Sequence, residues 1–171
     1  MPNSFVSHHN GDLGGRPRQT RWLTPSWIVD ALGVFDLDPA GAPGHSLADH
    51  SYLLERGEDG LALPWQGRVW LNPPYGRQTE PFLRKLADHG NGIALIFART
   101  DTRVFDEQVW QRADGILFIR GRLTFLDADG KPATANAGAA SCLVAYGAPN
   151  AAALRESGIA GTFVPLSGTA E

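Results

Sequence analysis

The sequence predicts an α/β fold with a mostly parallel sheet and helices on both of its faces. Apolar runs that indicate strands alternate along the chain with segments of helical periodicity. One of these runs, residues 92–98 (GIALIFA), is apolar without interruption, which is typical of a central parallel strand. Because the chain has 171 residues, 43% of them hydrophobic and 19% charged, we expect one domain with its own core.

The elements are expected in the following order. Residues 1–20 are polar and rich in glycine and are expected to form a flexible N-terminal arm, and residues 21–171 a single domain. A first helix begins at Thr24 and Pro25, which suit its cap and its first position, and ends at Gly33. Strands are then predicted over residues 34–38, 68–71, 92–98, 115–127 (one strand or a pair) and 141–147, and helices over 79–90, 102–114 and 150–158. Residues 41–67 are rich in turn formers and should hold little regular structure.

Charge is distributed unevenly along the chain. Residues 30–60 hold seven acidic residues and a single base, Arg56, whereas residues 68–103 hold six bases and three acids. The two halves would suit a cationic small ligand and a polyanion respectively, although an uneven solvated surface explains them equally well.

Several classes of protein are disfavoured. No apolar run approaches the roughly 18 residues of a membrane span, and no secretory signal is recognised, so a cytoplasmic protein is expected. The single cysteine, Cys142, lies in an apolar run and is predicted to be a buried, inert thiol. The five histidines show no metal-ligand spacing, and no metal site is predicted.

The stretch Asn72-Pro73-Pro74-Tyr75 follows the predicted strand at residues 68–71. Proline lacks an N–H and holds the preceding residue extended, so Asn72 and Pro73 have extended backbones. The Asn72 side-chain oxygen and the Pro73 carbonyl then face the crevice at the strand end as two acceptors, with Tyr75 beside them as a stacking surface. Two acceptors on the hydrogens of a planar amino group draw its nitrogen towards tetrahedral geometry and stabilise the charge that develops during attack. The alternative is a rigid turn with a packed tyrosine.

This strand and its NPPY end resemble the catalytic motif of S-adenosylmethionine-dependent amino-methyltransferases. Over residues 22–146 the chain resembles the phage-type DNA N6-adenine methyltransferases, the Dam-like group of phages and prophages. The stretches that carry the resemblance, in matching order, are residues 22–41, 59–77, 92–110 and 119–127. It implies an abbreviated Rossmann-like methyltransferase sheet, S-adenosylmethionine as cofactor, and methyl transfer to N6 of a flipped adenine in DNA.

The resemblance also assigns site residues. Asn72, Pro73, Pro74 and Tyr75 would be catalytic. The turn after the first strand, made of Asp38, Pro39, Ala40 and Gly41, would bind the cofactor. Thr24 and Pro25 would meet the methionine end of the cofactor, and Asp59 would meet its adenine. Apart from the resemblance, Arg77, Arg99 and Arg103 lie beside predicted strand-end loops, and Arg120 and Arg122 flank Gly121, so phosphate contact with DNA is expected from these arginines. Phe125 is a candidate for stacking on the extruded base. Solvated surface charges and packing in the core are the alternatives for the arginines and for Phe125 respectively.

Two alternatives remain open. The same four residues serve methyltransferases that act on RNA bases or on protein glutamine, because those substrates also present planar nitrogens. The chain would otherwise be a non-catalytic DNA- or protein-binding module that kept the fold, which is favoured by the short turn at residues 38–44 with only two glycines.

Overall fold

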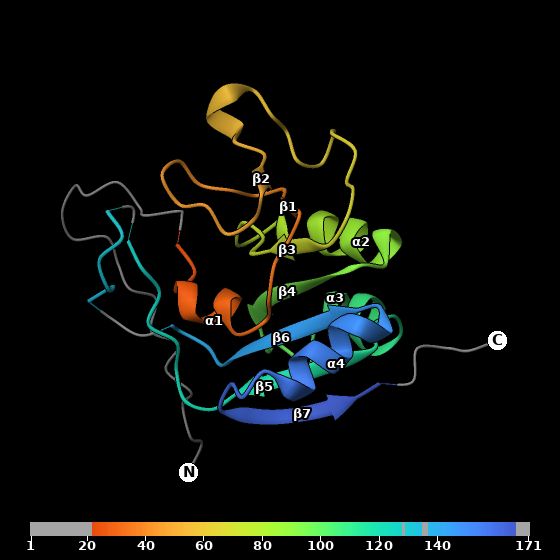
Figure 1. Ribbon diagram of the computed structural model, residues 1–171. Helices are drawn as coiled ribbons and strands as arrows, with labels where there is room; N and C mark the ends of the chain where they lie inside the picture. Colours follow the sequence, from red (N-terminus) through yellow and green to blue (C-terminus); the bar gives the residue numbers. More distant parts are fainter. Residues whose placement is uncertain (1–21, 128, 135–136, 167–171) are drawn as a thin grey trace, which may run out of the picture.

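The computed structural model describes residues 22–127, 129–134 and 137–166, so the predicted arm over residues 1–20 lies outside the described residues. The described strands form one seven-stranded sheet in the order β2-β1-β3-β4-β6-β5-β7 (Figure 1). The strands are β1 (Leu37–Asp38), β2 (His50–Ser51), β3 (Val69–Leu71), β4 (Gly92–Phe97), β5 (Gly115–Ile119), β6 (Ser141–Tyr146) and β7 (Gly161–Pro165). The helices are α1 (Ser26–Asp30), α2 (Thr79–His89), α3 (Arg103–Phe105) with its π-helical continuation η2 (Asp106–Trp110), and α4 (Ala148–Glu156), and a 3-10 turn, η1 (Leu54–Arg56), lies between β2 and β3.

The sheet is mixed, so the predicted mostly parallel sheet is not confirmed. The strands β2, β1, β3 and β4 pair in parallel, but β6 is antiparallel to both β4 and β5, and β7 is antiparallel to β5. The longest pairing, from Gly92 opposite Tyr146 to Phe97 opposite Ser141, is antiparallel. The physical reason is the connection between β5 and β6: a parallel return needs a crossover, usually a helix, and the described residues between these strands form none. The chain therefore enters β6 beside the carboxyl end of β5, and β6 runs antiparallel to β5.

Helices pack on both faces, as predicted. Alternate residues of each strand point to opposite faces, and the buried side chains accordingly form two clusters. One cluster joins α2 and α3 to one face through residues such as Leu83, Leu86 and Phe105. The other joins α1 and α4 to the opposite face through Ile28 and Leu154 (Figure 1). The α/β class of the fold is thereby confirmed, and so is the burial of Cys142 in β6.

Several local predictions are confirmed and others are not. Helix α2 ends at Gly90, whose φ of +72° suits glycine. Helix α1 begins after Pro25 without a side-chain cap, so the expected capping role of Thr24 is wrong. The chain turns at Gly121, with φ of +80°, so the strand predicted over residues 115–127 ends at Ile119. The short β2 and the edge strand β7 were not predicted, because neither has a clear alternating pattern.

Candidate active site

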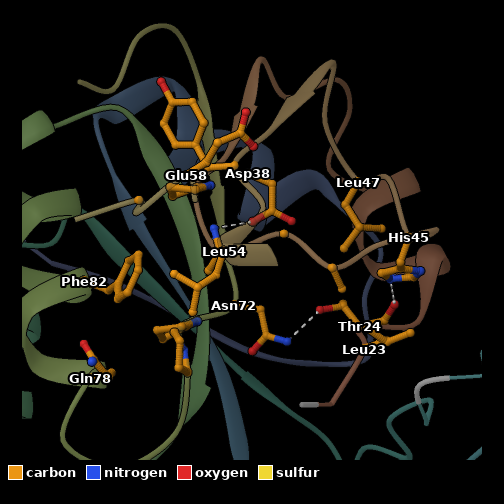
Figure 2. A pocket seen from close by; sticks show the side chains of 18 of the residues that line it. Leu23, Thr24, Asp38, His45, Leu47, Leu54, Glu58, Asn72, Gln78 and Phe82 are labelled. Atoms are coloured by element: carbon orange, nitrogen blue, oxygen red, sulfur yellow. Dashed lines mark hydrogen bonds between the residues drawn. The ribbon is translucent and has the colours of Figure 1, made fainter. Parts of the chain in front are cut away.

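A cavity of about 840 Å³ lies at the carboxyl ends of β1 and β3. Its volume is in the range that holds a cofactor or drug-sized ligand. Asp38, the last residue of β1, and Asn72, the first residue after β3, both line it, as Figure 2 shows. The predicted site residues that line it are Thr24, Asp38, Pro39, Ala40, Gly41, Asp59, Asn72, Pro73, Pro74 and Tyr75. The turn at residues 38–41 after β1 and the turn at residues 72–75 after β3 therefore meet in one cavity.

The Asn72 side chain has a fixed orientation. Its Nδ2 donates to the Trp22 carbonyl at 3.0 Å and to Thr24 Oγ1 at 3.2 Å. Its Oδ1 is shielded from solvent and has no hydrogen-bond partner among the described residues. A buried acceptor without a partner is costly, so a donor supplied by a ligand would recover that energy. The next residues are held too, because Thr79 Oγ1 donates to the Pro74 carbonyl at 2.8 Å.

Tyr75 is supported by two other aromatic rings. Its ring stacks on Phe97 at 4.7 Å between centroids, with 23° between the planes. Phe125 meets the same ring edge-on at 6.3 Å and is only 4% exposed. Burial raises the pKa of the Tyr75 phenol above its ordinary value, so the ring stays neutral at physiological pH. Phe125 does not line the cavity; it is buried and packs edge-on against Tyr75.

The turn after β1 is tightly built. Asp38, only 4% exposed, accepts a hydrogen bond from the Ala40 N–H at 3.0 Å through Oδ1 (Figure 2). Behind this turn stands Gly60, where a Cβ would lie 1.9 Å from the Pro39 carbonyl oxygen. The two loops that carry Asp38 and Asp59 therefore touch through their backbones, which requires glycine at this point.

Residues 58–61 form one wall of the cavity, and the segment of residues 58–63 is held in place by α2. Lys85 Nζ donates to the carbonyls of Gly60, Leu61 and Leu63 within 3.1 Å. Asp59 accepts from the Leu61 N–H at 2.9 Å, and Glu58 accepts from the Leu53 N–H at 2.8 Å. These carboxylates thus shape the wall while also giving it negative charge.

Sequence reasoning missed part of the lining. The missed residues fall mostly in the aperiodic segment 41–67 and in α2, and include His45, Leu54, Glu58, Gln78 and Phe82. The excess of acids in residues 30–60 was the available signal for Glu58, because it indicated a cationic ligand without naming the residue. Of the predicted cofactor residues, Pro25 is buried and does not line the cavity.

The predicted DNA-contacting arginines lie apart from the cavity lining. Arg77 follows β3, Arg99 follows β4, and Arg120 and Arg122 follow β5. These three strands run in one direction, so the arginines share the carboxyl edge of the sheet with the cavity. All four are exposed, and none forms an ion pair with a described residue. Arg103 differs, because its guanidinium is paired with Glu80 and Glu107.

Within residues 22–127, 129–134 and 137–166, no group of three or more His, Cys, Asp or Glu side chains is placed to hold a metal ion. No helix in the described part of the chain is long and apolar enough to cross a membrane.

The fold and the cavity define an α/β protein with a ligand-sized cavity at the carboxyl ends of its strands, next to an Asn-Pro-Pro-Tyr turn. Comparison with known families places it more narrowly. The chain belongs to the DNA N-6-adenine-methyltransferase (Dam) family, whose model matches residues 15–153. The DNA N-6-adenine-methyltransferase of Escherichia phage T1 is 29% identical over 113 residues, which are 60% of this chain and 46% of that protein. The chain thus spans about half the length of the curated relative it matches, and no solved structure matches it.

Proposed function

We propose that this protein transfers the methyl group of S-adenosylmethionine to the exocyclic N6 of adenine in DNA. The observation that carries the proposal is the buried Asn72 Oδ1, which lacks a hydrogen-bond partner within the described residues and belongs to a side chain that lines the cavity. A planar amino group is the donor that such an acceptor, beside the Pro73 carbonyl, fits best. Family membership supports the same reaction.

The cavity suits S-adenosylmethionine by the chemistry of its lining. Asp38, Glu58 and Asp59 give it negative charge, and Phe82 and Leu61 give it apolar surface. S-adenosylmethionine carries an ammonium, a sulfonium and a flat adenine, so it would meet acids and apolar side chains that match it. When bound, it supplies a methyl group already activated by the sulfonium. We assign the ammonium to Asp38 and the adenine ring to the part of the cavity lined by Asp59 and Phe82.

The chain's own residues then handle the substrate amino group. Asn72 Oδ1 and the Pro73 carbonyl accept its two hydrogens, which localises the lone pair on nitrogen and stabilises the positive charge formed as the nitrogen is methylated. The Tyr75 ring, fixed by Phe97 behind it, offers its other face to the extruded base. The methylated nitrogen finally loses one proton to solvent, so no strong base is needed.

DNA would lie across the carboxyl edge of the sheet. Arg77, Arg99, Arg120 and Arg122 surround this edge, and their charges are not neutralised by ion pairs with described residues. Arginines in this state are suited to phosphate contacts, which position DNA without reading its sequence. Arg103 is a poorer candidate, because Glu80 and Glu107 already neutralise it.

The test is methyl transfer from labelled S-adenosylmethionine to long mixed-sequence DNA, followed by nucleoside mass spectrometry. We expect N6-methyladenine from the wild type and at least a hundredfold less from Asn72→Ala, by analogy with loss of a transition-state hydrogen-bonding group. Cofactor binding by Asn72→Ala, measured by calorimetry, should persist and controls for folding. Label in RNA or protein glutamine, and not in DNA, would refute the proposed substrate. Absence of both label and cofactor binding would refute the enzyme and favour a binding module.

The DNA surface has its own test. Arg120→Ala and Arg122→Ala should each weaken DNA binding and reduce the slope of log K against log salt by about 1. Arg112→Gln is the control, because Arg112 lies at the opposite edge of the sheet, before β5, and pairs with Asp88. Equal salt slopes for all three variants would contradict the proposed surface.

A further inference from the structure

The orientation of the Asn72 amide is decided by the segment 22–24. The Trp22 carbonyl, 3.0 Å from the amide, is an acceptor only, so the side of the amide that faces it must be the NH2 group. Thr24 Oγ1 lies on the same side at 3.2 Å. The amide oxygen must then point away from both, and Figure 2 shows it turned away from Thr24. If the amide rotated by half a turn, it would present a donor where the substrate amino group needs an acceptor.

The segment itself is held on two sides. Leu23 exchanges two backbone hydrogen bonds with Leu126, at 3.0 and 2.9 Å. His45 Nε2 contacts the Thr24 carbonyl at 2.9 Å, a geometry in which the imidazole N–H donates (Figure 2). Thr24 is only 1% exposed, and its hydroxyl does not cap α1. A threonine that is buried, held through its backbone and not used as a cap has its hydroxyl available for Asn72.

We propose that Thr24 is a positioning residue, whose hydroxyl together with the Trp22 carbonyl fixes the Asn72 amide so that Oδ1 receives the amino group of the base. This inference rests on the proposed function. It differs from the role implied by family resemblance, in which Thr24 meets the methionine end of the cofactor. The two roles have different consequences: a positioning residue acts on the rate of transfer, and a cofactor ligand acts on cofactor affinity.

The experiment compares Thr24→Val, which keeps the shape and removes the hydroxyl, with Thr24→Ser, which keeps the hydroxyl. Thr162→Val is the matched control, because Thr162 is exposed on the edge strand β7. Single-turnover methyl transfer is measured at saturating cofactor and DNA, and the Kd for S-adenosylmethionine is measured by calorimetry. For Thr24→Val we expect a rate about tenfold lower, as for loss of one hydrogen bond, with the Kd changed less than about twofold. Thr24→Ser should recover most of the rate, and Thr162→Val should match the wild type.

Other results would overturn the inference. A Kd raised about tenfold in Thr24→Val, with an unchanged rate at saturation, would make Thr24 a cofactor ligand. An unchanged rate and Kd would show that the hydroxyl has no role.

A second readout does not depend on activity. The side-chain NH2 resonances of Asn72, assigned through their loss in Asn72→Asp, should shift and exchange faster with water in Thr24→Val and not in Thr162→Val. Resonances that do not move would refute the hydrogen bond. If the wild type transfers no methyl group, the proposed function fails, and this measurement still decides whether Thr24 holds Asn72.

Discussion

Replacing Gly60 with alanine tests how the cavity is assembled. A Cβ at this position would lie 1.9 Å from the Pro39 carbonyl oxygen and 2.9 Å from its carbon. These are backbone atoms and cannot rotate away, so the turns that carry Asp38 and Asp59 must separate. Overpacking of this kind costs about 1–3 kcal/mol. For a chain of this length, roughly 2–4 °C per kcal/mol gives a fall in Tm of about 2–12 °C.

The same separation should weaken cofactor binding, because both turns line the cavity. Gly138→Ala is the matched control: a Cβ there meets nothing within 4 Å, and neither glycine has a positive φ. Thermal unfolding with and without S-adenosylmethionine reads out both effects, because a ligand that binds only the folded state raises Tm. If Gly60→Ala has the same Tm and the same cofactor-induced shift in Tm as Gly138→Ala, the close approach of the two turns is refuted.

Three further perturbations have defined outcomes. Lys85→Met removes the donor to the carbonyls of Gly60, Leu61 and Leu63, so the free energy of unfolding in urea should fall by about 1–3 kcal/mol. An unchanged free energy would contradict the role of Lys85 in holding this segment. Burial raises the pKa of the Cys142 thiol to about 12, so the unfolded state, with a thiol pKa near 8.5, loses its proton first. The contribution of the buried thiol to the free energy of unfolding is therefore fully present below about pH 8.5 and is lost as the pH rises towards 12, by up to about 1.4 kcal/mol per pH unit. Cys142→Ala should remove this component of the pH dependence. Phe97→Leu removes the ring behind Tyr75 and should lower transfer by about 2–10-fold without changing cofactor Kd, whereas a change in Kd alone would place the stack in the cofactor site.

Much of the site could be predicted because it depends on local chemistry. Two consecutive prolines after an apolar strand fix the backbone of Asn72 and Pro73 whatever surrounds them. The positions of Asp38 and Asn72 at strand ends follow from the same local patterns, and strands of one direction bring such ends to one edge. Burial of Cys142 and the end of α2 at Gly90 are also local properties, of an apolar run and of a glycine with positive φ.

The direction of β6 follows from the connection that precedes it. The residues between β5 and β6 lack a helical pattern, and without a crossover helix the next strand returns antiparallel. The apolar character of β6 does not decide its direction, because a central antiparallel strand is buried on both faces as well.

The sequence by itself determined the α/β class, the Asn-Pro-Pro-Tyr turn and the acidic turn after the first strand, because each depends on residues that are neighbours in the chain. Only the tertiary structure decided the partners of these groups. Thr24 is 48 positions from Asn72, and Lys85 is 22 or more positions from the carbonyls it holds. Contacts at such separations depend on how the sheet and its loops pack, which no local pattern encodes, and here they set which atom of Asn72 is left to meet a substrate.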